Sequence, residues 1–445
     1  MFSRIRYIFF LIPTLCLTNH ASLAQENTLT LERCIQLALE NNLDAQQGHI
    51  RTEVGRINLR QSKQNLLPNL IGSLNHNFEI GRAIDPETNQ YLNNVTNRYG
   101  NQSLSSSVVL FDGLRMFRTI TQQAYAYRAT QFEEQNIKEQ LALGVTSAYI
   151  QALTARDMVA QADSQAAVTH QHVQRNTLLH EQGAIAPGDF YDLKGQYAND
   201  LNNVNQARND FQEALVSLFR LLNLPYDASV QLAPLSELPL KNAPAVTGEQ
   251  LFQHAVDRLS LIKAVDNRQQ QARLGLKVAR SYYFPSLSAG AGLSSSYIHG
   301  NGGYIDQIQD RIGKNLGFTL AIPIFNKWQA RNNVSLAKLD VLDAENIART
   351  SRNELQQTTN QALFNLEAAR ERYKNLVEQT ENYAESFRIA EVRFNAGAIN
   401  SVDFLIAKNK MDNANANLLI ARYQWHLQQR IVDYYNGEMV LSQED

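Results

Sequence analysis

The chain has 445 residues, of which 44% are hydrophobic and 19% are charged, and its formal net charge at pH 7 is −2. This composition is typical of an ordered protein with room for two or three domains. The slightly negative charge argues against a nucleic-acid partner.

The first predicted element is an export signal over residues 1–24. Two arginines precede an apolar stretch from Tyr7 to Leu17, and Ser22-Leu23-Ala24 has the small-x-small pattern of a cleavage site. The residue before Cys16 is not small, which disfavours lipidation. Cleavage leaves Cys34 as the only cysteine, so an intramolecular disulfide is excluded. No later segment has 18 uninterrupted apolar residues, so any membrane-spanning segments must be β-strands.

The remaining chain is an internal duplication with a period of roughly 215 residues, far too long for a solenoid. We expect a first repeat over 25–224, a proline-rich linker over 225–246, a second repeat over 247–437 and a C-terminal tail over 438–445. Thr30, Ala38 and Pro68 of the first repeat recur as Thr247, Ala255 and Pro285. The strings Gly183-Ala184-Ile185 and Asp189-Phe190 recur as Gly397-Ala398-Ile399 and Asp403-Phe404.

The first repeat opens with a predicted helix from Thr30 to Leu67, followed by strands over 69–80 and 102–111. A polar segment from Gly81 to Asn97 is expected to be the loop between these strands. Pro68 marks the switch from helix to strand, because the residue before a proline avoids the helical conformation.

A helical hairpin is predicted to complete this repeat. Its proline-free outward helix, from Leu114 to Glu181, would reach about 100 Å at 1.5 Å per residue. A seven-residue repeat rich in alanine predicts a left-handed coiled coil with closely spaced helices. The chain then reverses at a tip near 183–188 and returns along a helix that starts at Pro187 and ends near Pro225.

The second repeat is predicted to follow the same order. Its elements are a helix over 247–283, strands over 286–298 and 315–325 around a loop from His299 to Lys314, a helix from Trp328 to Asn395, a tip near 397–402 and a helix from Ser401 to Asn436. We expect the shorter helices to stack end to end in pairs, since each pair sums to one long helix. The pairs are the helix ending near Pro225 with that opening at Thr247, and the last helix with the first.

The four predicted strands alternate between an apolar face and a small or polar face. The second strand, for example, has Leu104, Val108 and Leu110 on one face and Ser103 and Ser105 on the other. A soluble sandwich gives the same alternation, but segments of about 10 residues fit tilted membrane strands better. Aromatic residues gather at the strand ends, where they suit a membrane-interface girdle: Phe111, Tyr282, Tyr283, Phe284, Phe325 and Trp328.

Four strands are too few to close a membrane barrel, which needs about eight. Two chains would supply eight strands around a lumen packed with side chains. Three chains would supply twelve strands and leave room for passage, so we expect a homotrimer.

The order of the motifs resembles the TolC family of outer-membrane efflux proteins from Leu29 to Gly437. The motifs are Thr-Leu-Glu and Ala-Leu separated by five residues, Leu-Pro-x-Leu, an Ile-Pro-Ile-Phe turn at 322–325, and Gly-Ala-Ile and Asp-Phe separated by three residues. This resemblance implies an α plus membrane-β fold whose trimer has a 12-stranded outer-membrane barrel and a 12-helix periplasmic α-barrel. It also implies a passive duct that works with a periplasmic adaptor and an inner-membrane pump of the RND or ABC type.

The resemblance also implies roles for the two hairpin tips. The turns Gly183-Ala184-Ile185-Ala186 and Gly397-Ala398-Ile399-Asn400 would contact the adaptor, although any helical hairpin needs such turns. Asp403 matches the first of two aspartates that narrow the entrance in the family, but Ile406 stands at the second position. Asp189 and Asp192 are the other candidates for this constriction. An aspartate in the first turn of a helix also stabilises the helix dipole wherever it lies.

The sequence does not predict an enzyme, a cofactor or a metal site. His170 and His172 lie two residues apart, hence on different helix faces, and His180 is not three or four residues from either. No nucleophile–base pair or phosphate loop stands out. The alternative to a duct is a trimeric coiled-coil envelope adhesin or tether, which would not need two hairpins and four separated strands. The cargo stays open.

Overall fold

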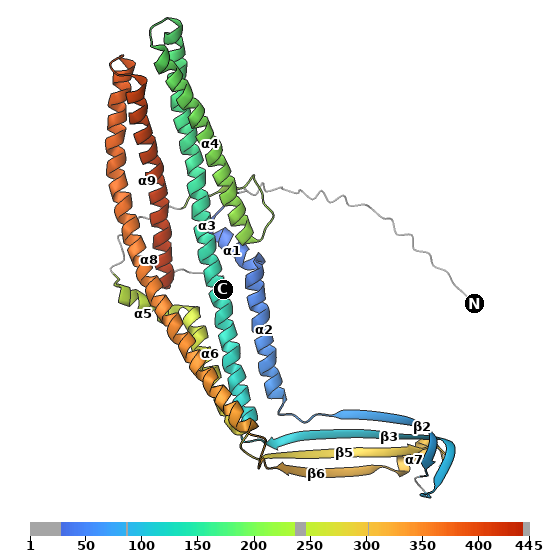
Figure 1. Cartoon of the computed structure of the whole chain (residues 1–445). Coiled ribbons are helices and arrows are strands. Elements are labelled where there is room, and N and C mark those ends of the chain that lie inside the picture. Colours follow the sequence, from blue (N-terminus) through green and yellow to red (C-terminus); the bar gives the residue numbers. More distant parts are fainter. Residues whose placement is uncertain (1–27, 86–87, 236–245, 301, 439–445) are drawn as a thin grey trace, which may run out of the picture.

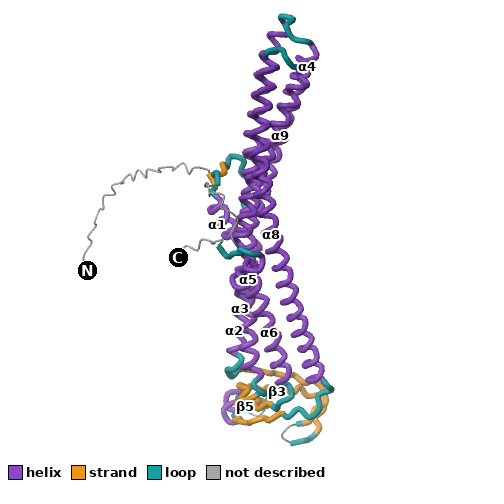
Figure 2. The backbone as a smooth tube through the Cα atoms, turned by 90° about the vertical axis from the view of Figure 1, so that its left-hand side faces the viewer, coloured by secondary structure: helices purple, strands orange, loops and turns teal. Residues whose placement is uncertain are grey.

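The computed structural model describes residues 28–85, 88–235, 246–300 and 302–438 and is strongly elongated (Figure 1). Helical hairpins form one end, a β-sheet forms the other, and shorter helices lie between them (Figure 2). The predicted export signal, most of the predicted tail and residues 236–245 of the predicted linker lie outside the described residues.

The two repeats share the order of two short helices, two strands, a long helix and a returning helix; the first also has a short strand at each end, and the second has a short helix between its strands. The elements of the first are β1 (Thr28–Leu29), α1 (Leu31–Asn41), α2 (Leu43–Gln64), β2 (Ile71–Ile84), β3 (Tyr91–Phe111), α3 (Arg115–Glu181), α4 (Pro187–Leu222) and β4 (Gln231–Leu232). Those of the second are α5 (Gly248–Arg258), α6 (Ser260–Ser281), β5 (Ser286–Ile298), α7 (Tyr304–Asp310), β6 (Gly313–Ala321), α8 (Gln329–Asn395) and α9 (Ser401–Tyr435).

The main sheet has four antiparallel strands in the order β2-β3-β5-β6, so the two repeats meet between β3 and β5. Register partners share a face, because side chains alternate along each strand. Leu104 pairs with Gly72 and Leu293, which defines an apolar face that also carries Leu316 and Phe318. The opposite, polar face carries Ser73, Ser103, Ser105, Ser288, Ser294, Asn315 and Thr319.

The strand boundaries differ from the prediction in three places. Most of the expected loop from Gly81 to Asn97 is strand, because the backbone ladder continues past the apolar residues through pairs such as Ile80 with Thr96. The expected loop from His299 to Lys314 contains the helix α7. The last strand covers Gly313–Ala321 rather than 315–325, since Pro323 has no backbone N–H for a ladder.

Two helices expected to be continuous are broken. The predicted helix from Thr30 to Leu67 stops at Asn42, whose side chain accepts hydrogen bonds from the backbone N–H groups of Asp44 (2.9 Å) and Ala45 (3.3 Å) and so caps α2. The predicted helix over 247–283 breaks at Leu259, where ψ is 134°. The two long helices α3 and α8 run without a break for 67 residues each.

The end-to-end stacking occurs within each repeat, not in the pairs that we expected. The Asn42 side chain donates a 3.1 Å hydrogen bond to the carbonyl of Leu221, at the end of α4. In the second repeat, Arg258 at the end of α5 donates a 2.7 Å bond to the carbonyl of Asn436, just after α9. Because α4 and α2 both pack along α3, the hairpin returns to its own repeat.

The largest core cluster lies in the middle of the molecule, where α1, α3 and α4 meet. Cys34, Leu153 and Leu215 are fully buried there, and burial raises the pKa of the Cys34 thiol to about 12. The Tyr149 hydroxyl lies 2.8 Å from the carbonyl of Leu29 and 2.7 Å from that of Ala233. This hydroxyl therefore ties the parallel pair of β1 and β4 to the core.

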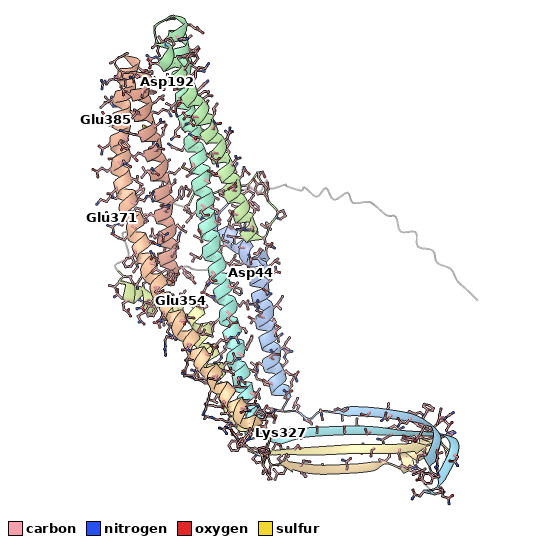
Figure 3. All side chains as sticks on the ribbon, in the orientation of Figure 1. Asp44, Asp192, Lys327, Glu354, Glu371 and Glu385 are labelled. Carbon is pink, nitrogen blue, oxygen red and sulfur yellow. The ribbon has the colours of Figure 1, made fainter. Side chains whose placement is uncertain are left out.

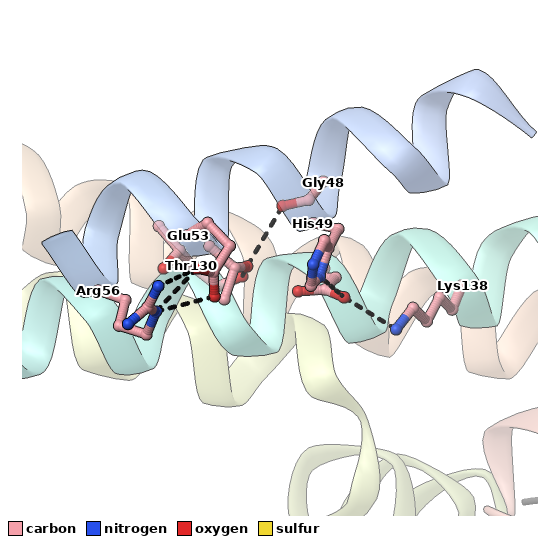
Figure 4. A network of polar contacts seen from close by, with 8 residues as sticks. Gly48, His49, Glu53, Arg56, Thr130 and Lys138 are labelled. Atoms are coloured by element: carbon pink, nitrogen blue, oxygen red, sulfur yellow. Dashed lines mark hydrogen bonds and ion pairs between the residues drawn. The ribbon is translucent and has the colours of Figure 1, made fainter. Parts of the chain in front are cut away.

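Below this cluster, α2 packs closely on α3 (Figure 4). A Cβ atom at Gly48 would lie 3.1 Å from the Cδ1 atom of Ile137, so even an alanine there would require that side chain to shift. The buried Thr52 hydroxyl bridges the carbonyls of Gly48 (3.2 Å) and Thr130 (3.1 Å). In the part of the chain that the structure describes, every helix is too short or too polar to cross a lipid bilayer.

Candidate functional site

The two predicted hairpin tips are built in the same way. Gly183 and Gly397 have φ of 70° and 71°, a left-handed conformation that glycine adopts without strain. The N–H groups of Ala184 and Ala398 donate back to the carbonyls of Leu179 (2.7 Å) and Arg393 (2.8 Å). These bonds close a Schellman motif at the end of each long helix.

The helices that leave the two tips begin differently. α4 begins at Pro187, which has no N–H and needs no acceptor. α9 begins at Ser401 after Asn400, whose side chain accepts a 2.9 Å hydrogen bond from the N–H of Asp403. The first N–H of α9, that of Ser401, therefore needs an acceptor from elsewhere.

That acceptor comes from the other hairpin, near the tip where Figure 3 labels Asp192. Asp189 accepts from the Ser401 N–H at 2.8 Å, and Asp192 accepts from the Ser401 hydroxyl, also at 2.8 Å. Two predicted constriction residues thus cap α9 and favour its dipole. Asp403, at the position of the second repeat that matches Asp189, is exposed to solvent.

An apolar cluster lies directly beneath both tips. Leu193 and Phe404 are fully buried, and the Phe394 and Phe404 rings stack at 4.7 Å. Ile185 and Ile399 pack against this cluster and are only partly exposed. The accessible members of the predicted tips are therefore Gly183, Ala184, Ala186, Gly397, Ala398 and Asn400.

A second set of contacts joins α3 to α8 below the tips. The buried His172 imidazole lies 3.2 Å from Glu391, and the Arg175 guanidinium donates to the side chain of Asn395. Burial lowers the pKa of His172, and this effect outweighs the opposing attraction of Glu391. His170 and His180 instead stack on Tyr197 and Phe190. Within the described residues, no three His, Cys, Asp or Glu side chains are placed to hold a metal ion.

The most buried charge of the hairpins is Lys408 of α9, whose side chain is 2% exposed. Its ammonium donates to Asp412 at 2.6 Å and to Asp200 of α4 at 3.2 Å. Asp200 also accepts a 2.5 Å bond from the Thr169 hydroxyl of α3. Burial raises the pKa of Asp412, and Lys408 acts against that shift. We call these residues the Lys408 cluster; it links α3, α4 and α9.

Beside the Lys408 cluster, a groove of about 900 Å³ runs between α3, α4 and α9. Amide side chains make up much of its lining, among them Gln151, Gln165, Asn199, Asn203, Asn409 and Asn413. Neither the groove nor the cluster was predicted. The spacing does contain a signal for Lys408, because it follows buried Phe404 by four residues and so lies on the same helix face.

The predicted girdle residues all lie where the sheet meets the helices, around Lys327 in Figure 3. The switch from strand to helix uses left-handed backbone at Leu114 and Trp328. Asp112 accepts from the N–H of Met116 (3.3 Å) and so caps α3. The exposed fractions of the girdle residues are 41% for Phe111, 44% for Tyr282, 53% for Tyr283, 52% for Phe284, 70% for Phe325 and 59% for Trp328.

The sequence profile of the outer membrane efflux proteins matches residues 34–224 and 251–433, which make up most of both repeats. The chain belongs to this family. Over 423 residues it is 23% identical to the outer membrane protein TolC of Escherichia coli (strain K12), covering 93% of this chain and 83% of that protein. This outer membrane efflux protein is accordingly located in the outer membrane.

Solved structures share the fold of this outer membrane efflux protein. The Campylobacter jejuni CmeC outer membrane channel superposes with a TM-score of 0.78 at 19% identity, over 94% of this chain and 87% of that one. The open state of the Neisseria gonorrhoeae MtrE outer membrane channel gives a TM-score of 0.73 at 19% identity, over 91% and 88% of the two chains.

Proposed function

We propose that three copies of this chain form the passive outer-membrane exit duct of a tripartite efflux or secretion system. The observation that carries the proposal is the four-stranded sheet, whose outer strands β2 and β6 are both edge strands. In a lipid bilayer each unpaired edge group costs several kcal/mol, so edges must be closed. Pairing β2 of one copy with β6 of the next closes the sheet, and three copies supply twelve strands.

The helical region supports the same assembly. In its lower half the helices form a row of α2, α3, α6 and α8, each packed on the next. Both ends of this row expose apolar residues at helical spacing, with Ile50, Val54 and Ile57 on α2, and Leu336, Leu339 and Leu342 on α8. Exposed stripes of this kind mark association surfaces. We infer that α2 of one copy packs on α8 of the next, which continues the barrel as a 12-helix tunnel.

The free carboxylate of Asp403 fits the entrance constriction better than Asp189 or Asp192. In a closed ring the two hairpins alternate, so Asp403 faces the start of α4 in the neighbouring copy. That helix starts with Pro187, which lacks the N–H that Ser401 donates to Asp189. Asp403 then has no counterpart of that bond, and three such carboxylates at the opening attract cations.

The duct carries out no chemical step. A periplasmic adaptor would contact the exposed tip residues, such as Ala184 and Ala398, and an inner-membrane pump of the RND or ABC type would supply the energy. An adhesin or tether, the alternative, would not need two helical hairpins or a sheet whose edges pair between copies. The cargo, whether small molecules or polypeptides, is set mainly by the pump.

The assembly is tested by native mass spectrometry in detergent, where the main species should have three times the mass of the processed chain. Val54→Asp should shift the protein towards monomer, because it places a charge in the exposed stripe of α2. Arg51→Asp makes a larger change in charge but lies about 90° around the helix from the middle of this stripe, so it should leave the trimer intact. A monomeric wild type would remove the proposal.

A further inference from the structure

The short helix α7 lies beside the strands, at the end of the sheet far from the long helices (Figure 1). Ser295 and Gln102 are register partners on the apolar face of the sheet. The Ser295 hydroxyl donates a 2.8 Å hydrogen bond to the carbonyl of Ile308, and the Gln102 amide donates a 2.8 Å bond to the hydroxyl of Tyr304. The helix is therefore held on the apolar side of the strands and not on the polar side.

The amide of Gln307 fixes the orientation of α7. This buried side chain accepts from the N–H of Ile298 at 3.0 Å and donates to the carbonyls of Ile298 (2.9 Å) and Gly302 (3.2 Å). With all its polar atoms bonded to the backbone, Gln307 allows the helix little freedom to rotate.

The remaining faces of α7 differ in polarity. Ile305 of α7 is 67% exposed, and Ile312, just after the helix ends, is 51% exposed. At 100° per residue, Asp306 and Asp310 lie about 100° and 140° from Ile305 around the helix, so they occupy a different face. Ile312 lines a hollow of about 390 Å³ together with Leu74, Leu104 and Leu293, so the isoleucine flank borders the aliphatic part of the sheet.

Aromatic rings lie at the level of α7 on the same face. The Tyr297 ring lies 4.9 Å from that of Tyr304 and 6.1 Å from the imidazole of His76. Leu287, the register partner of Phe111, lies ten residues before Tyr297 on β5. Ten residues of a strand tilted by about 40° rise about 25 Å, the height of the apolar band of an outer-membrane barrel.

We propose that α7 rests in the outer leaflet of the membrane, with Ile305 and Ile312 among the acyl chains and one acyl chain in the hollow beside Leu293. This inference rests on the proposed function, because it requires the apolar face to contact lipid. Asp306 and Asp310 then face water. Lys314, the register partner of Leu293, carries its ammonium on the same face, where its stem reaches towards the phosphate of that lipid.

The depth of α7 is measured with single nitroxide labels by electron paramagnetic resonance, comparing collisions with oxygen and with a water-soluble nickel chelate. Cysteines are introduced at Ile305, Asp306, Phe318 and Thr319, and the protein is reconstituted into phosphatidylcholine–phosphatidylglycerol vesicles. Cys34 can stay in place, because burial raises its thiol pKa to about 12 and leaves it unreactive. Phe318 marks the apolar face, and the neighbouring Thr319 marks the polar face.

The ratio of oxygen collisions to nickel collisions should be several-fold higher for the label at Ile305 than for the label at Asp306. The ratio at Ile305 should lie between those at Asp306 and Phe318. Equal nickel access at Ile305 and Asp306, with Phe318 still protected, would overturn the role of α7 and leave the duct intact. Nickel access at Phe318 as high as at Thr319 would overturn both, because the apolar face would not be in lipid.

Discussion

Replacing Lys408 by methionine tests how the two hairpins are held together. Methionine keeps the length and the apolar stem of the side chain but removes the ammonium. Asp200, with a side chain that is 5% exposed, and the partly buried Asp412 would then lie without their cation. Removing one partner of a buried ion pair costs about 3–5 kcal/mol, far more than a surface pair contributes.

The loss should be local, since the Lys408 cluster joins α9 to α3 and α4 without contacting the sheet. Hydrogen exchange of the α9 amides near residue 408 reports the free energy of local opening. At 1.36 kcal/mol per factor of ten, a loss of about 3 kcal/mol corresponds to exchange that is roughly a hundredfold faster. The effect should shrink at acidic pH, because burial raises the pKa of Asp412 and its protonation removes one of the two uncompensated charges.

The matched control is Lys410→Met, which removes an exposed lysine from the same helix. Its effect should stay within about 0.5 kcal/mol, or less than threefold in exchange. Equal exchange rates for Lys408→Met and Lys410→Met would refute the idea that the buried cluster holds the hairpins together.

Three further outcomes follow from the hairpins. Gly397→Val should lower the free energy of unfolding by about 1–2 kcal/mol, because φ is 71° there. Gly144→Ala, inside α3, should raise it by about 0.5–1 kcal/mol. Thermal melting followed by circular dichroism measures both, and equal melting temperatures for the two variants would contradict this expectation. Ala398→Glu should weaken cross-linking to an adaptor without changing the native mass, and unchanged cross-linking would remove the tip contact. The pKa of His172 is lowered from 6.5 on folding, so the closed contact between α3 and α8 should be stable above pH 6.5 and weaken as the pH falls. Hydrogen exchange at the tip should follow this trend, and His172→Gln should abolish it; a variant that kept the full pH dependence would exclude His172 as its source.

Much of the fold follows from patterns that extend over many residues. Two helices of 67 residues carry a long apolar period without proline, so their ends could be predicted closely. The breaks at Asn42 and Leu259 could not, because neither residue is a glycine or a proline. Asn42 ends its helix where it meets the carbonyl of Leu221, a contact between residues 179 positions apart.

The candidate site likewise has features that the sequence predicts and features that it does not. The tip turns have a local signal, since Gly183 and Gly397 close each long helix. The bonds that Ser401 donates to Asp189 and Lys408 donates to Asp200 join residues 212 and 208 positions apart, so they depend on how the repeats pack. One sequence shows that these side chains exist but not that they meet.

The central claim, a gated duct, is tested most directly by single-channel conductance of the purified protein in a planar lipid bilayer. The wild type should give small cation-selective steps, and Asp403→Ala should enlarge them or reduce their selectivity, because three carboxylates leave the constriction. Steps that are the same in both proteins would return Asp403 to a role at the start of α9. No steps from either protein would contradict the duct itself.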